Sequence, residues 1–133
     1  MCIRDSITVG HIKTPQLRIK LFNLALAAGF KFPIIKSPLS YVSKYADIQE
    51  GSIVMHNALI NANVAVGRNT IINSKALIEH DCIVGENCHI STNTLLNGGT
   101  LVGEGSFIGS GAVTKEGVLV PPNSFIKAGS IVT

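Results

Sequence analysis

The chain has 133 residues and a formal net charge of +3, with 46% hydrophobic and 14% charged residues. This length fits one domain with at most a small appendage. The mild charge, without any basic run, argues against nucleic acid as a partner. With no apolar stretch long enough to span a bilayer and no signal peptide, we expect no membrane association and a cytoplasmic location.

Residues 1–41 predict a small α/β unit. Ile7–Val9 and Pro33–Ile35 are short apolar runs that we expect to form strands. Thr14 and Pro15 together predict the start of a helix, with Thr14 as the N-cap and Pro15 in the first turn. Gly29 predicts its end.

Within this helix, the spacing of four apolar residues predicts the packed face. These residues are Leu17, Leu21, Leu24 and Ala28. The strand–helix–strand segment is too small to form a domain alone. We expect it to be the last part of a larger α/β unit or a cap on the following element.

From residue 42 onward the chain has a period of six. Fifteen of sixteen positions at this spacing are Val, Ile or Leu. They are Val42, Ile48, Val54, Ile60, Val66, Ile72, Ile78, Val84, Ile90, Leu96, Val102, Ile108, Thr114, Val120, Ile126 and Val132. Neither a helix nor a flat strand repeats on six, but a short strand plus a turn does.

The other positions of the hexad agree with this interpretation. From Gly51 to Gly129, the position three residues after each repeat position is Gly, Asn or Asp in thirteen of fourteen cases, with Lys75 as the exception. These residue types tolerate a positive φ at a tight corner. The next residue is always small, and two of these small residues are Cys82 and Cys88. We interpret both as buried small hydrophobic residues, with a disulfide or a catalytic thiol as the alternatives.

The pattern resembles the hexapeptide repeat of left-handed β-helices. The resemblance implies an all-β fold: a left-handed parallel β-helix of hexapeptide repeats over residues 42–133, about five coils tall. Residues 1–41 would be the remnant of an N-terminal α/β sugar-nucleotide-binding subdomain. Because the repeat stops in mid-pattern at Thr133, we expect a chain truncated at both ends.

The residue before each aliphatic position points outward, because neighbours on a strand alternate. Thirteen of fourteen such residues between 53 and 131 are apolar, and His89 is the exception. An apolar exterior of this extent indicates an interface. Since hexapeptide proteins usually assemble as trimers, the resemblance implies a homotrimer. His89 could serve this interface or contact a ligand.

Residues three hexads apart stack on successive coils. This spacing places Gly98 one coil from His80, a possible base beside a possible oxyanion donor. A second column contains Ser110 and Ala128 among other small residues above His56, which predicts a shallow groove. The alternative interpretation of His80 is an ordinary surface histidine.

The segment around His80 carries a more specific motif. Asn73 lies seven residues before His80, Asp81 and Cys82 follow it directly, and His89 lies nine residues after it. This arrangement resembles the sialic acid O-acetyltransferase and nucleotide-aminosugar N-acetyltransferase family of hexapeptide acetyltransferases.

The resemblance implies acetyl-CoA as co-substrate, no metal, and transfer of the acetyl group to a hydroxyl or amine of a sugar or nucleotide sugar. His80 would be the general base, oriented by Asp81, and Asn73 would hold the acceptor. His89 and Gly98 would contact the acetyl thioester. Ser110 and Ala128 would carry the pantetheine arm between subunits.

Two other functions remain open at this point. One is a catalytically inactive structural or regulatory β-helix subunit. The other is a β-helix carbonic anhydrase, which requires a zinc site of three histidines at a subunit interface. The spacing of His56, His80 and His89 lacks the His-x4-His pair of that family.

Overall fold

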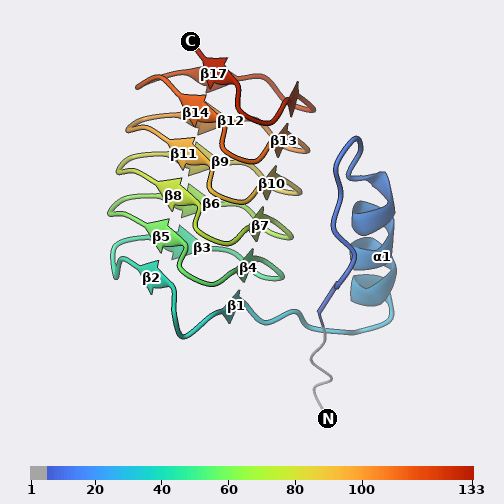
Figure 1. Ribbon diagram of the computed structural model, residues 1–133. Helices are drawn as coiled ribbons and strands as arrows, with labels where there is room; N and C mark the ends of the chain where they lie inside the picture. The colour runs from blue at the N-terminus through green and yellow to red at the C-terminus, as the bar shows by residue number, and fades with distance from the viewer. Residues whose placement is uncertain (1–5) are drawn as a thin grey trace.

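The computed structural model describes residues 6–133 as one helix beside a triangular prism of two-residue strands (Figure 1). Face 1 consists of β1 (Ile35–Lys36), β4 (Ile53–Val54), β7 (Ile71–Ile72), β10 (His89–Ile90), β13 (Phe107–Ile108) and β16 (Phe125–Ile126). Face 2 consists of β2 (Tyr41–Val42), β5 (Leu59–Ile60), β8 (Leu77–Ile78), β11 (Leu95–Leu96), β14 (Val113–Thr114) and β17 (Ile131–Val132). Face 3 consists of β3 (Asp47–Ile48), β6 (Ala65–Val66), β9 (Ile83–Val84), β12 (Leu101–Val102) and β15 (Leu119–Val120).

Each strand from β1 to β14 pairs in parallel with the strand three hexads further along the chain, as with Ile53 and Ile71 or Leu77 and Leu95. The predicted parallel β-helix of hexapeptide repeats is therefore confirmed, and no long loop interrupts the coils between residues 48 and 126. We name its edges by the faces they join. Edge 1–2 contains residues 37–40, 55–58, 73–76, 91–94, 109–112 and 127–130. Edge 2–3 contains residues 43–46, 61–64, 79–82, 97–100 and 115–118. Edge 3–1 contains residues 49–52, 67–70, 85–88, 103–106 and 121–124.

The corners confirm the predicted backbone conformation. All fourteen corner positions have a positive φ, including the exception Lys75 with a φ of 60°. Only Gly tolerates this region freely, and Asn and Asp tolerate it better than other residues. The repeat therefore bends the chain where its residue types allow the bend.

The aliphatic residues of the repeat form one continuous core inside the prism. Ile60, Ile72, Ile78, Ile90, Leu96 and Ile108 are fully buried. The small corner residues, among them the free Cys82 and Cys88, close the core at the edges. Burial raises the pKa of the Cys88 thiol to about 11, so this thiol stays protonated at neutral pH.

The N-terminal segment differs in detail from its prediction. Helix α1 spans Gln16–Ala27, and its N-cap is Pro15 rather than Thr14, whose hydroxyl only accepts a long 3.4 Å contact from the Gln16 N–H. The helix ends as predicted at Gly29, which has a φ of 87°. Residues 7–10 form no strand.

The second predicted strand, at Pro33–Ile35, belongs to the prism and not to the α/β segment. The strand observed there, β1, pairs with β4 and opens face 1. The β-helix therefore begins one strand before residue 42. The prediction that residues 1–41 are part of a sugar-nucleotide-binding subdomain stays a prediction.

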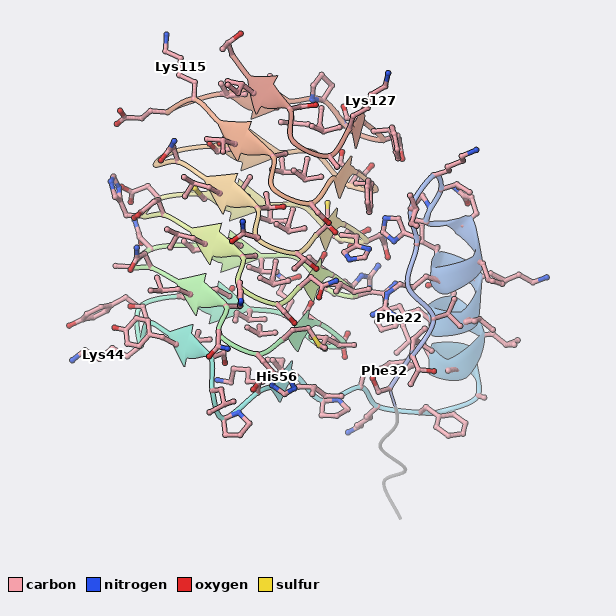
Figure 2. All side chains as sticks on the ribbon, viewed as in Figure 1. Phe22, Phe32, Lys44, His56, Lys115 and Lys127 are labelled. Carbon is pink, nitrogen blue, oxygen red and sulfur yellow. The ribbon has the colours of Figure 1, made fainter. Side chains whose placement is uncertain are left out.

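The packed side of α1 is also not the predicted leucine face. Leu17 and Leu24 are exposed, whereas Phe22 and Arg18 are buried. Phe22 packs against Phe32, with ring centroids 4.5 Å apart, and lies over Gly51 of the first coil (Figure 2). The tertiary fit of one aromatic ring therefore outweighs the apolar stripe of the isolated helix.

Arg18 ties the N-terminal segment to the prism through backbone carbonyls. Its Nη1 donates to the carbonyls of Ile7 at 2.6 Å and Val9 at 2.9 Å, and its Nε donates to the carbonyl of Asn69 at 3.3 Å. Burial lowers the pKa of Arg18 to about 10, so the guanidinium remains charged at neutral pH.

This docking changes the expectation for the outward apolar residues. On face 1, Ile71 and Phe107 are already buried by the chain's own N-terminal segment. That face therefore needs no second copy to cover its centre. On face 3, however, Ile83, Leu101 and Leu119 are exposed, and on face 2 Leu77 and Leu95 are half-buried.

The contact of Phe22 predicts a local loss of stability. Replacement by Ala removes a buried ring, a change that typically costs about 3–5 kcal/mol. We expect Phe22→Ala to accelerate amide hydrogen exchange across α1 while the strands of the prism keep their protection. Leu17→Ala, at an exposed position of the same helix, should change neither. Equal acceleration in the prism would contradict the separate docking of α1.

Candidate active site

The sequence-predicted base and its partner lie together on edge 2–3. His80 and Asp81 occupy the corner after β8, where Asp81 has a φ of 61°. The Asp81 Oδ2 lies 2.8 Å from His80 Nδ1, and its Oδ1 accepts a 2.8 Å hydrogen bond from the Asn63 side chain one coil below. The carboxylate is thus held on both oxygens, and Asp81 favours the tautomer that leaves His80 Nε2 without its proton.

The His80 ring lies directly against Gly98 on the next coil. A Cβ added to Gly98 would stand 2.8 Å from His80 Cε1 and 2.9 Å from His80 Nε2. A side chain at this position would therefore displace the His80 ring, whereas the φ of Gly98 imposes no need for glycine. Among residues 6–133, no acceptor meets the Gly98 N–H, although the neighbouring Gly99 N–H donates to the His80 carbonyl at 3.0 Å.

A polar, open cavity of about 480 Å³ surrounds this pair. It is lined by Glu79, His80, Asn97, Gly98 and Glu116. Both side chains of the His80–Asp81 pair remain more than half exposed. In one copy of the chain the site is thus a corner without an opposite wall.

The charges around His80 favour its protonated form. The hydrogen bond to Asp81 raises the pKa of His80, with smaller contributions from the charges of Asp81, Glu79 and Glu116. In turn, the hydrogen bonds that Asp81 accepts from Asn63 and then from His80 lower the pKa of Asp81. The pair therefore combines a carboxylate that is ionised at neutral pH with a ring whose uptake of a proton that carboxylate favours.

Asn73 and His89 form a second cluster, away from His80. The Asn73 Nδ2 lies 3.1 Å from His89 Nε2, and His89 Nδ1 donates to the His11 carbonyl at 2.7 Å. Burial lowers the pKa of both histidines, that of His11 to about 4, so both rings are neutral. His89 thus contacts the N-terminal segment on face 1, while its contact with a thioester stays a prediction.

Ser110 and Ala128 lie on edge 1–2, where both are exposed. Ser110 shares a 2.9 Å hydroxyl contact with Ser91. This edge and edge 2–3 lie on opposite sides of face 2. The structure therefore brings His80, Asp81 and Gly98 together, brings Asn73 and His89 together, and leaves Ser110 and Ala128 on a different edge from the base.

The three histidines considered for zinc do not converge within the chain. His56 Nδ1 lies 2.6 Å from the Ser37 hydroxyl on edge 1–2, and His80 and His89 lie on a different edge and face. In the described part of the chain, no group of three His, Cys, Asp or Glu side chains could hold a metal ion. Nor do residues 6–133 include a helix long and apolar enough to cross a membrane.

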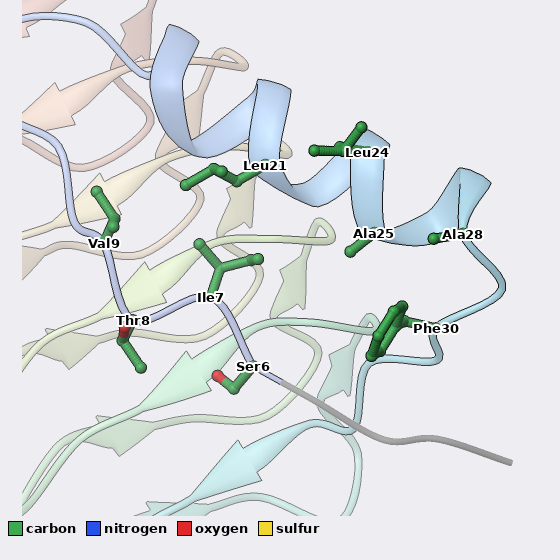
Figure 3. A pocket seen from close by; sticks show the side chains of 9 residues that line it. All are labelled: Ser6, Ile7, Thr8, Val9, Leu21, Leu24, Ala25, Ala28 and Phe30. Atoms are coloured by element: carbon green, nitrogen blue, oxygen red, sulfur yellow. The ribbon is translucent and has the colours of Figure 1, made fainter.

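An apolar groove of about 380 Å³ lies between α1 and residues 6–9 (Figure 3). Leu21, Leu24 and Ala25 line it from the helix, opposite Ile7 and Val9. None of its lining residues carries an acid or a base. It accounts for the leucine face of α1 but cannot supply acid–base chemistry.

Sequence reasoning missed Asn63 and Asn97 as parts of the site. Asn63 lies three hexads before Asp81, and Asn97 lies three hexads before Lys115, so the stacking period already places each of them on edge 2–3. The eighteen-residue spacing that places Gly98 beside His80 therefore also identifies Asn63 and Asn97 as neighbours of the site. What it cannot reveal is which of their atoms form hydrogen bonds.

The chain is similar to known transferases in sequence and in structure. Residues 81–116 match the family described as bacterial transferase hexapeptide (six repeats). The chain is 34% identical to a mutant of perosamine N-acetyltransferase from Caulobacter crescentus, whose structure contains CoA and GDP-perosamine, over 98% of this chain and 61% of that one, with a TM-score of 0.95. No curated protein sequence matches the chain.

The acetyltransferase domain of PglB from Neisseria gonorrhoeae is also similar. It is 33% identical over 92% of this chain and 60% of that one, with a TM-score of 0.89. The same domain in complex with acetyl coenzyme A is 32% identical over 91% of this chain and 61% of that one, with a TM-score of 0.86. The chain thus spans about three fifths of the length of these relatives.

The hydrogen bond between His80 and Asp81 yields a prediction for pH titration. Because an anionic acceptor favours the imidazolium, Asp81→Asn should lower the pKa of His80. The measurement is an NMR titration of the His80 ring proton. Glu50→Gln, an exposed substitution on edge 3–1, should leave that pKa unchanged. An unchanged pKa in Asp81→Asn would show that the pair is not coupled in solution.

Proposed function

We propose that this chain carries the acyl-transfer site of an acetyl-CoA-dependent sugar acetyltransferase. The placement of His80 Nε2 against the buried Gly98 peptide, with Asp81 on the other ring nitrogen, carries the proposal. Similarity to an enzyme that binds CoA and GDP-perosamine supports a sugar amine, attached to a nucleotide, as the acceptor. A hydroxyl acceptor would use the same base.

The arrangement fits direct attack on a thioester. His80 Nε2 accepts the proton that the acceptor nitrogen loses as it bonds to the thioester carbon. The Gly98 N–H donates to the carbonyl oxygen, on which negative charge develops. Breakage of the carbon–sulfur bond releases CoA as a thiolate, which takes up the proton from His80 or from solvent. No covalent bond to the protein forms.

Asp81 has two roles in this scheme. Its hydrogen bond with Nδ1 fixes the ring so that Nε2 faces the reacting groups, and its charge stabilises the imidazolium that forms. Because Asn63 also donates to this carboxylate, Asp81 is oriented before any substrate binds. The base is thus preorganised by residues on two successive coils.

The separation of the proposed site residues supports a composite site between copies. Ser110 and Ala128, which would contact the pantetheine arm, lie across face 2 from His80. In a threefold assembly with face 2 toward the axis, edge 2–3 of each copy lies beside edge 1–2 of the next. A homotrimer would therefore supply the wall that the His80 corner lacks, with Asn73 and His89 of the neighbour near the reacting groups.

The functional prediction concerns His80. General-base catalysis contributes roughly 10²–10⁴-fold, so His80→Ala should lower kcat by that order. The dissociation constant for acetyl-CoA should change little, because the base acts on the acceptor. Steady-state kinetics with nucleotide-linked amino sugars and calorimetry with acetyl-CoA measure the two quantities.

Glu50→Gln provides the control, since Glu50 is exposed on edge 3–1, away from both the His80 corner and edge 1–2. It should keep wild-type kcat. Near-wild-type turnover of His80→Ala would show that another group activates the acceptor. Absence of acetyl-CoA binding by the unmodified chain would instead favour an inactive structural subunit.

The assembly prediction concerns Leu77 on face 2. A charge at this position would be buried at the threefold axis, so Leu77→Asp should convert trimers into monomers. Sedimentation velocity at micromolar concentration measures this shift. Leu17→Asp, on the exposed side of α1, should leave the trimer intact. A trimer that survives Leu77→Asp would place another face at the axis.

A further inference from the structure

The single exception in the aliphatic column of the repeat, Thr114, disturbs the backbone ladder at one step. In thirteen other steps, the residue after each strand donates its N–H to the carbonyl of the inward residue one coil later, as from Glu79 to Leu96 at 2.9 Å. At Asn97 the N–H donates instead to the Thr114 hydroxyl, at 3.0 Å. The strand pair β11–β14 accordingly retains only Leu95–Val113 as a register pair.

The displaced carbonyl finds a different donor. The Asn97 side chain donates from Nδ2 to the Thr114 carbonyl at 2.8 Å, which replaces the missing backbone bond. Side chain and backbone of the two residues have thus exchanged partners. The corner that begins at Asn97 therefore has a hydrogen-bond arrangement that no other described corner shares.

A second threonine completes the cluster. The Thr100 hydroxyl lies 2.8 Å from the Thr114 hydroxyl and donates to the Asn97 carbonyl at 2.6 Å. Both threonines are fully buried. Burial of a hydroxyl costs free energy unless the hydroxyl is hydrogen-bonded. The Thr114 hydroxyl avoids this cost through its hydrogen bonds with the Asn97 N–H and the Thr100 hydroxyl.

The cluster holds both ends of one corner, residues 97–100, and that corner contains Gly98. We propose that Thr114 is a positioning residue, which through Asn97 and Thr100 sets the Gly98 peptide against the His80 ring. Its catalytic meaning rests on the proposed function, in which the Gly98 N–H meets the thioester oxygen. Thr114 itself touches neither the base nor the substrate.

The geometry explains why the position of this corner matters. With the His80 ring in this position, one carbon added at Gly98 would already displace the ring. A shift of the corner toward His80 would displace the ring, and a shift away would open the gap between base and N–H. Misplacement of a reacting group by about 1 Å can cost on the order of 10²-fold in rate.

Thr114→Val tests the proposal, because valine keeps the shape of the side chain and removes the hydroxyl. A crystal structure of the variant should show the Asn97 N–H on the carbonyl of residue 114, as in the other coils, and Gly98 shifted from the His80 ring. We expect kcat to fall roughly ten- to a hundredfold with little change in KM for acetyl-CoA. Thr114→Ser, which keeps the hydroxyl, should restore most of the activity.

Thr70→Val is the matched control. The Thr70 hydroxyl is also buried and bonds to the Gly85 carbonyl at 2.9 Å, but it lies on edge 3–1. This variant should lose stability without losing kcat. Thr114→Val with Gly98 in its original place, or with Gly98 shifted and unchanged turnover, would overturn the proposal. If the unmodified chain transfers no acetyl group, the structural comparison alone decides whether Thr114 positions Gly98.

Discussion

The closure of one coil by three six-residue units is the constraint on which the rest of this structure depends. It requires a sharp corner after every strand, and each corner needs a positive φ, which Gly, Asn and Asp adopt most readily. Because each coil stacks on the one below, residues three hexads apart are fixed next to each other. The pairs Asn63–Asp81 and His80–Gly98 are both products of this stacking. The site is therefore built on the hydrogen-bonded stack of coils, with Thr114 as a local adjustment.

The same constraint divides the chemistry among different edges. Within one copy, residues on edge 1–2 and residues on edge 2–3 cannot meet, because face 2 always lies between the two edges. A groove along Ser110 and Ala128 can serve His80 only if it belongs to another copy. The incompleteness of the single chain and the outward apolar residues of face 2, such as Leu77 and Leu95, both favour assembly. The docked N-terminal segment, by contrast, removes most of face 1 from consideration as an interface.

The period of the sequence determines the parallel β-helix, its corners and the contact between His80 and Gly98, because stacking follows directly from spacing. The docking of α1 could not be predicted in this way. Its leucine spacing indicates one face, but Phe22 packs against Phe32 over Gly51 on another, a fit that depends on three separate segments. The exchange of hydrogen-bond partners between Asn97 and Thr114 could not be predicted either, since the repeat pattern identifies Thr114 only as the one non-aliphatic residue. Periodicity predicts neighbours, whereas hydrogen-bond choice among those neighbours depends on atomic positions.

The central claim is that the His80 corner of one copy works with edge 1–2 of the next, and mixed assemblies test it most directly. His80→Ala removes the base, and Ser110→Arg fills the proposed groove, so each variant alone should be inactive. If the copies are unfolded and refolded together in equal amounts, about a quarter of the sites should combine an intact base with an intact groove. The account predicts recovery of about a quarter of the unmodified acetyl-transfer rate. If the mixture stays as inactive as its components, base and groove belong to the same copy, and the composite site is wrong.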